Sequence, residues 1–153
     1  MALAAHAFSL LHSIPQDYQD ALELHNNARK DVGVEPLIWS EQLAREAQRY
    51  ASEMARTGKF EHAEVDDGEN LYWHSAEINS PGVAASNAWI EEKSEYNHRG
   101  NWNDNWQAAG HYTQIVWRST THMGLGVAVS NSGETYVVAR YNPPGNFFGE
   151  KPY

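Results

Sequence analysis

The chain has 153 residues, of which 41% are hydrophobic and 20% charged, a balance typical of one globular domain with its own core. Its formal net charge of -9, from 11 basic and 20 acidic residues, argues against a nucleic-acid partner or a basic membrane patch. Without cysteine the chain has no disulfide, thiolate metal site or cysteine nucleophile, and no apolar stretch approaches the roughly 20 residues of a transmembrane segment.

The N-terminal stretch MALAAHAFSLLHSIP predicts a loose segment, residues 1–15, ahead of the domain. It is slightly apolar, but it lacks a charged n-region and is interrupted by His6 and His12, so it makes a poor signal peptide. The remaining residues, 16–153, show no repeat or linker, which predicts a single domain.

Two helices are predicted in the first third of the chain. From Asp17 the stretch DYQDALELHNNARKDVG has apolar residues at helical spacing and can end at Gly33. His25 lies on its face, and we interpret it as a hydrogen-bonded core residue rather than a ligand. The stretch SEQLAREAQRYASEMARTG is the clearest helix, capped by Ser40 and ended by Gly58.

A third helix is predicted near Val83 to Tyr96, with Ser80-Pro81 as its start signal. The stretch from Arg99 to Gly110, RGNWNDNWQAAG, is typical of a loop. Three strand-like runs follow, TQIVWR, HMGLGVAV and TYVVARY, and NSG predicts a turn between the last two. Because helices come first and strands gather late, we expect an α+β domain with a sheet covered by helices.

Four polar residues are candidates for a functional site. His111 stands in GHYTQIVWRST, and His62 stands in GKFEHAEVDDGENLYW, where a turn would bring it to Glu69. Glu92 is on the third helix, where we expect it to face the sheet. Spacing alone does not join these residues, and the alternative is that they are ordinary surface and core polar groups.

Longer motifs resemble the CAP superfamily, which comprises cysteine-rich secretory proteins, antigen 5 and pathogenesis-related class 1 proteins. GHYTQIVWRST is similar to one family signature, and VVARYNPPGNF (137–147) to another, except that Ala139 stands where disulfide-bonded members have cysteine. HNNAR, GENLYW and WIEEKSEYN resemble further family blocks. The end of the chain is similar to plant and fungal pathogenesis-related class 1 proteins, whereas the absence of cysteine resembles Golgi-associated members.

The resemblance implies an α-β-α sandwich with a central antiparallel sheet and a large cleft. It also implies that His62, Glu69, Glu92 and His111 form the family's tetrad, with the two histidines binding zinc or another divalent metal. Two imidazoles alone would make a weak, exchangeable site, and protonation of either below pH about 6 should release the metal.

The resemblance further implies binding of a sterol or a fatty acid. The expected positions are Pro81, Gly82 and Val83 in NSPGVAAS, and Trp102 and Trp106 in NWNDNWQ. Plain packing is the alternative for the two tryptophans. Metal-dependent hydrolysis in the same cleft is a further alternative, but the chain has neither an H-E-x-x-H nor a G-x-S-x-G motif, so we expect no enzyme activity.

Residues 143–153, PPGNFFGEKPY, resemble a signalling peptide released from plant members, with Asn142 before the cut. The alternative is an extended tail that wraps the domain. The resemblance implies a secreted protein acting in defence, virulence or lipid export, whereas the missing cysteines and the poor leader favour the cytosol or the surface of the Golgi membrane. A monomer or a weak dimer is expected.

Overall fold

The computed structural model describes residues 14–96 and 106–153. The expectation that helices come first and strands gather late holds only in part, because the strands Ile38–Trp39 and Gly68–His74 lie between helices and only the last two strands end the chain. In chain order the helices and strands are α2 (Gln16–Asp31), β1 (Ile38–Trp39), α3 (Glu41–Thr57), β2 (Gly68–His74), α4 (Pro81–Glu91), the 3-10 helix η1 (Glu92–Glu95), α5 (Trp106–Ile115), β3 (His122–Val129) and β4 (Thr135–Asn142).

The predicted capping signals define the helix ends. The Ser40 hydroxyl accepts the backbone N–H of Leu43 at 3.2 Å, and Gly58, at φ 72°, ends α3 by donating its N–H to Met54. Proline at the first turn of α4 confirms the predicted start, and η1 extends that helix as far as Glu95.

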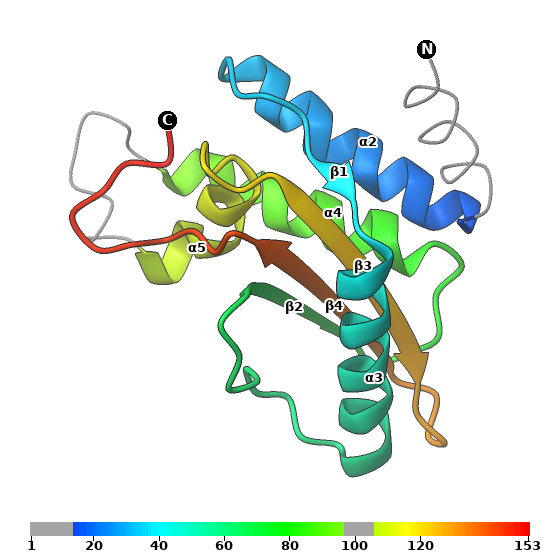
Figure 1. Ribbon diagram of the computed structural model, residues 1–153. Coiled ribbons are helices and arrows are strands. Elements are labelled where there is room, and N and C mark those ends of the chain that lie inside the picture. Colours follow the sequence, from blue (N-terminus) through cyan, green and yellow to red (C-terminus); the bar gives the residue numbers. More distant parts are fainter. Residues whose placement is uncertain (1–13, 97–105) are drawn as a thin grey trace.

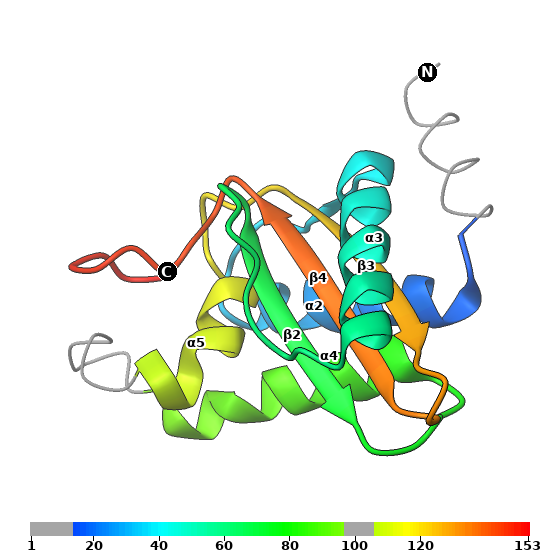
Figure 2. The same cartoon turned by 90° about the horizontal axis from the view of Figure 1, so that it is seen from below.

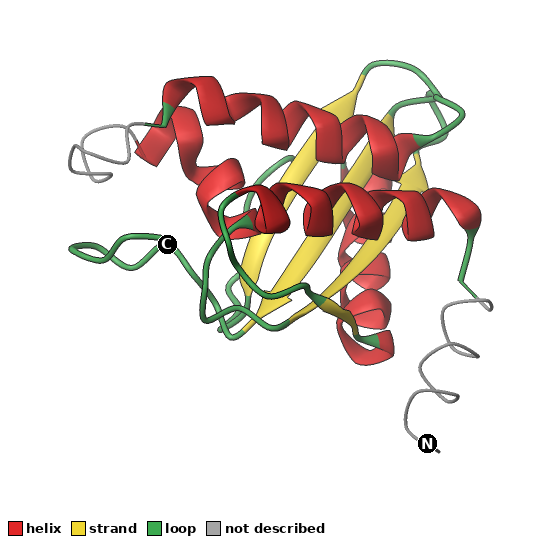
Figure 3. Cartoon of the chain, turned by 90° about the horizontal axis from the view of Figure 1, so that it is seen from above, coloured by secondary structure: helices red, strands yellow, loops and turns green. Residues whose placement is uncertain are grey.

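The strands form one sheet in the order β1-β3-β4-β2, and two of its three pairings, β3–β4 and β2–β4, are antiparallel, as predicted (Figure 1). The short edge strand β1, which runs parallel to β3, is an addition to the prediction. Helix α3 covers one face of the sheet, while α2, α4 and α5 cover the other (Figures 2 and 3). The fold is therefore the expected α-β-α sandwich.

Strand β4 is buried on both faces and divides the core in two. Val137, Ala139 and Tyr141 pack with α2, α4 and α5. The alternate residues Tyr136 and Val138 pack with α3. This period of two places successive side chains on opposite faces of the sheet, so a single strand serves both layers of helices.

The prediction of a strand at TQIVWR is wrong, because Thr113–Ile115 form the last turn of α5 and the chain then turns toward β3. The β-branched residues of this run suggested a strand, but a short buried apolar run does not separate a strand from a helix end. Arg29 from α2 holds the segment: its guanidinium donates to the carbonyls of Ile115, Trp117 and Thr120 at 2.8–2.9 Å.

The prediction of a loop up to Gly110 is also wrong over its last residues, since α5 already begins at Trp106. The stretch GENLYW belongs to strand β2, which the sequence did not predict, and the chain bends ahead of it so that His62 meets Glu69.

The tail lies against the domain. The backbone N–H of Gly145 donates to the Gln114 side chain at 2.9 Å, and the N–H of Arg118 donates to the carbonyl of Pro152 at 2.8 Å. The amide of Asn146 accepts from Thr113 at 2.7 Å. Release of a peptide after Asn142 would have to break these bonds, so the geometry favours the interpretation of a wrapped tail.

Two glycines of β3 allow α3 to lie directly on the sheet. A Cβ atom at Gly126 would stand 2.2 Å from the backbone nitrogen of Gln48, and one at Gly124 would stand 2.1 Å from that of Ala44. We therefore expect Gly126→Ala to lower the free energy of unfolding by more than about 2 kcal/mol, because backbone has to move to admit the methyl group.

Urea unfolding measures this change. The matched control is Gly110→Ala in α5, where the nearest heavy atom would lie 4.0 Å from the new Cβ. That substitution should leave stability unchanged or raise it by up to about 1 kcal/mol, since alanine is the better helix former. Equal stability of the two variants would contradict the close packing of α3.

Candidate functional site

His62 and Glu69 form the first of two histidine–carboxylate pairs. The Nδ1 of His62 lies 2.7 Å from Oε1 of Glu69, which also accepts the backbone N–H of Ala63 at 3.0 Å. The other oxygen of Glu69 accepts from Nε of Arg140 at 2.8 Å. Glu69 and Arg140 are cross-strand partners in the β2–β4 register, so the sheet itself sets this buried ion pair.

His111 and Glu92 form the second pair, between α5 and η1. One oxygen of Glu92 lies 2.7 Å from Nδ1 of His111, and the other accepts the backbone N–H of the same residue at 3.1 Å. The imidazole stacks on the indole of Trp89, with ring centroids 6.1 Å apart and planes at 25°. Glu92 thus faces His111 in the middle of α5, whereas the sequence led us to expect it toward the sheet.

Both histidines line one cavity of about 300 Å³, together with Glu69, Trp106 and Asn146. Glu92 lies behind His111 rather than on the cavity wall. Three members of the expected tetrad, from a loop, a strand and a helix far apart in sequence, therefore face the same space, which we call the tetrad pocket.

The hydrogen bonds define the protonation of the imidazoles. A carboxylate only accepts, so each Nδ1 carries a proton, and in a neutral ring Nε2 then carries the lone pair. A carboxylate behind Nδ1 is the arrangement that orients a histidine for binding metal through Nε2. The tetrad pocket supplies two such rings, and within residues 14–96 and 106–153 no group of three or more His, Cys, Asp or Glu side chains is placed to hold a metal ion.

A buried chain of hydrogen bonds connects the backbone of His111 to the core. The amide nitrogen of Asn70 donates to the carbonyl of His111 at 3.0 Å and to the hydroxyl of Tyr141 at 3.3 Å. The hydroxyl of Tyr141 lies 2.7 Å from Nε2 of His25, whose Nδ1 donates to the carbonyl of Ala21 at 2.8 Å. The interpretation of His25 as a hydrogen-bonded core residue is therefore confirmed.

The residues expected to contact a lipid lie in different places. Trp106 lines the tetrad pocket, and 46% of its surface is exposed. Pro81, Gly82 and Val83 begin α4, where the backbone N–H groups of the latter two donate to the carboxylate of Asp17 at 2.7 and 3.0 Å. These three do not line the tetrad pocket, and Trp102 lies outside the described residues.

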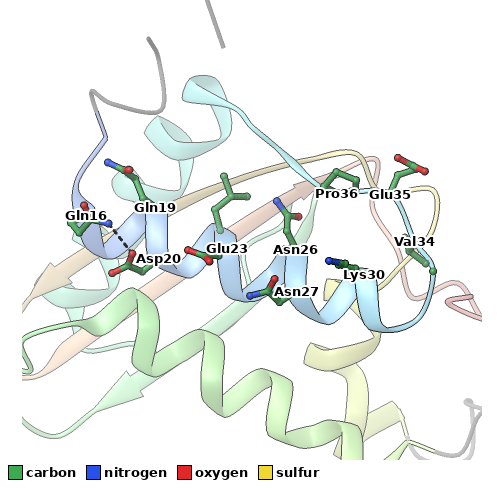
Figure 4. Close-up of a pocket in the computed structure, with 12 residues that line it drawn as sticks. Gln16, Gln19, Asp20, Glu23, Asn26, Asn27, Lys30, Val34, Glu35 and Pro36 are labelled. Carbon is green, nitrogen blue, oxygen red and sulfur yellow. Dashed lines mark hydrogen bonds between the residues drawn. The ribbon is translucent and has the colours of Figure 1, made fainter. Parts of the chain in front are cut away.

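A larger cavity of about 700 Å³, the α2 pocket, runs along α2 and residues 33–36 (Figure 4). Amide and charged side chains dominate its wall, among them Gln19, Asn27 and Lys30. The Gln19 side chain donates to the carbonyl of Ile14 at 2.8 Å, and none of the four residues of the expected tetrad lines this cavity.

Sequence reasoning missed Asn70, Arg140 and Tyr141, although all three stand in the quoted motifs GENLYW and VVARYNPPGNF. What was lacking was the strand register. Because β2 was not recognised as a strand, nothing indicated that Glu69 would face Arg140 or that Asn70 would point to the core.

An α-β-α sandwich with two histidine–carboxylate pairs at one cleft is the architecture that the motifs implied. The family model described as "CAP: Cysteine-rich secretory protein family" matches residues 22–141. The chain therefore belongs to the CAP family, as a member without cysteine.

Relatives and solved structures agree with this assignment. The chain is 43% identical to pathogenesis-related protein 1C of Nicotiana tabacum, over 88% of this chain and 80% of that protein. It is 40% identical to pathogenesis-related protein 1 of Arabidopsis thaliana, over 91% and 82%. The crystal structure of NaASP2 with Zn2+ superposes with a TM-score of 0.79 at 25% identity, covering 92% of this chain and 86% of that one.

The buried histidine predicts a dependence of stability on pH. Burial lowers the pKa of His25 from 6.5 to about 4, because the charged ring would lose its water. Between these values the unfolded chain binds more protons than the folded one, so stability falls as the pH falls. We expect this residue to reduce the free energy of unfolding by about 3 kcal/mol from pH 7 to pH 4.

Urea unfolding at a series of pH values measures this slope, and His25→Gln is the comparison. Glutamine does not titrate, so the variant should lose less stability over the same pH range. Parallel pH profiles for the two proteins would show that His25 is not the group responsible.

Proposed function

We propose that this CAP protein is a non-enzymatic binding protein whose tetrad pocket holds a divalent cation, zinc or another metal, between His62 and His111. The observation that carries the proposal is that each histidine has its Nδ1 on a carboxylate and lines the same cavity. The similarity to NaASP2, a protein crystallised with Zn2+, supports the choice of metal.

The site would be weak. Structural zinc sites have four protein ligands and catalytic ones usually three, whereas two imidazoles leave the remaining positions to water. An exchangeable cation is the expected consequence, with an affinity that falls when either ring is protonated.

The hydrogen bonds of the two glutamates argue against hydrolysis in this cleft. A metal-bound water needs a base to take its proton. Both oxygens of Glu69 already accept, from His62, Ala63 and Arg140. Both oxygens of Glu92 accept from His111. These carboxylates orient imidazoles, and the hydrogen bonds that they already accept disfavour a role as general base.

Calorimetric titration with ZnCl2 tests the cation site. We expect saturable binding at pH 7.5 that weakens by about tenfold or more in His111→Ala and in His62→Ala, and that weakens likewise in the unmodified protein at pH 5. The control is His122→Ala in β3, because the Nδ1 of that histidine lies 2.8 Å from the hydroxyl of Thr121 and the residue lies outside the tetrad pocket. Equal losses in all three variants would count against a site in the tetrad pocket.

We propose a sterol or a fatty acid as a second ligand, on the observation that Trp106 presents a half-exposed indole in the tetrad pocket. A cavity of about 300 Å³ is at the small end of ligand pockets, so it would take only part of a lipid. Phe147 and Phe148 follow Asn146 of the cavity wall in sequence and are 49% and 72% exposed, so further apolar surface is available in this segment.

The family description and the names of the plant relatives support a secreted protein with a role in defence. Among the residues that the structure describes, none of the helices is both long and apolar enough to cross a membrane.

Direct binding of a fluorescent sterol and a fluorescent fatty acid, each with and without zinc, tests the lipid proposal. Trp106→Ala should weaken binding by about tenfold, as expected for removal of an aromatic anchor. Trp73→Ala at the far end of β2 is the control, since that indole is 44% exposed but lies outside the tetrad pocket. No saturable binding of either lipid, or equal loss in both variants, would rule out this ligand class at Trp106.

A further inference from the structure

A second cavity lies on the other side of His62. It has a volume of about 570 Å³ and is formed by α3, the loop that follows it and strand β4. Tyr50, Glu53, Glu61, Glu64 and Arg140 line it, and His62 belongs to its wall as well as to that of the tetrad pocket. We call this cavity the Arg140 pocket.

Arg140 is a buried cation with unused donors. Only 3% of its surface is exposed, its Nε donates to Glu69, and its guanidinium lies 5.4 Å from the centre of the Tyr50 ring. Its two terminal nitrogens have no hydrogen-bond partner in the part of the chain that the structure describes. Among the described residues, the Tyr112 hydroxyl is the one side-chain polar atom that is both fully enclosed and without a partner. The terminal nitrogens of Arg140 are therefore not fully enclosed, and they reach the cavity that Arg140 lines.

Acidic side chains surround these donors. Glu53, Glu61 and Glu64 are exposed, and within residues 14–96 and 106–153 none of their carboxylates forms a hydrogen bond or an ion pair. The hydroxyl of Tyr50 donates to the carbonyl of Glu61, which ties the loop to α3. With Glu46 the wall carries four carboxylates against the two guanidinium groups of Arg49 and Arg140.

This combination selects a particular kind of ligand. A simple anion would meet four carboxylates, and a simple polycation would meet Arg140 and leave its donors unsatisfied. A peptide that carries lysine or arginine supplies main-chain carbonyls as acceptors for the Arg140 donors and cationic side chains for the carboxylates. We propose that the Arg140 pocket binds a basic peptide segment, whose main-chain carbonyl accepts from Arg140 and whose cationic side chain lies between Glu61 and Glu64.

The test is fluorescence anisotropy with a labelled hexapeptide of alternating glycine and arginine, in the presence of EDTA. Excluding metal separates the result from the cation site proposed above. We expect saturable binding that weakens about tenfold in the double variant Glu61→Gln/Glu64→Gln, which removes two exposed charges without touching the core. The same peptide with glutamate in place of arginine should not bind.

Two controls separate a built site from general attraction to an acidic protein. The double variant Glu77→Gln/Glu91→Gln removes the same charge at exposed positions outside the pocket and should change affinity less than about twofold. Spermine, a polycation without carbonyl groups, should compete poorly. Equal losses in the two double variants, or displacement of the peptide by spermine at equal charge concentration, would overturn the proposal.

Discussion

The amide of Asn70 is the contact on which the arrangement of the cleft depends. It joins the sheet to α5 by donating to the carbonyl of His111, and it joins the sheet to α2 through Tyr141 and His25. Every bond in this chain has a defined donor, and it ends on the Ala21 carbonyl. Because an unpaired polar group in such a core is costly, the three elements can meet in only one register.

The cleft carries charges that are already neutralised by their neighbours. Glu69 lies between the imidazole of His62 and the buried guanidinium of Arg140. Glu92 accepts from both the backbone nitrogen and the Nδ1 of His111. The two imidazole rings are therefore oriented by the protein itself, before any ligand binds. The same bonds that orient the imidazoles occupy both oxygens of each carboxylate with donors from the protein.

The parts of this structure that are local in sequence could be predicted, and those that depend on register could not. Neighbouring residues determine the helix caps at Ser40 and Gly58 and the two strands on either side of NSG, so these features could be predicted. The four residues of the tetrad were grouped only because their motifs resemble a family. The end of α5 was misjudged because its apolar run is packed by Arg29, a residue more than 80 positions away. The partnership of Glu69 with Arg140 required knowing that β2 pairs with β4.

The position of His62 makes the two cavities parts of one electrostatic system. Its ring is 63% exposed between them, and its carboxylate partner is 4% exposed and shared with Arg140. Both cavities meet at one carboxylate, because Glu69 accepts from His62 through one oxygen and from Arg140 through the other. Loss of that carboxylate would leave the imidazole without its orienting acceptor and the buried guanidinium without its counter-charge, so the geometry of neither cavity is independent of the other.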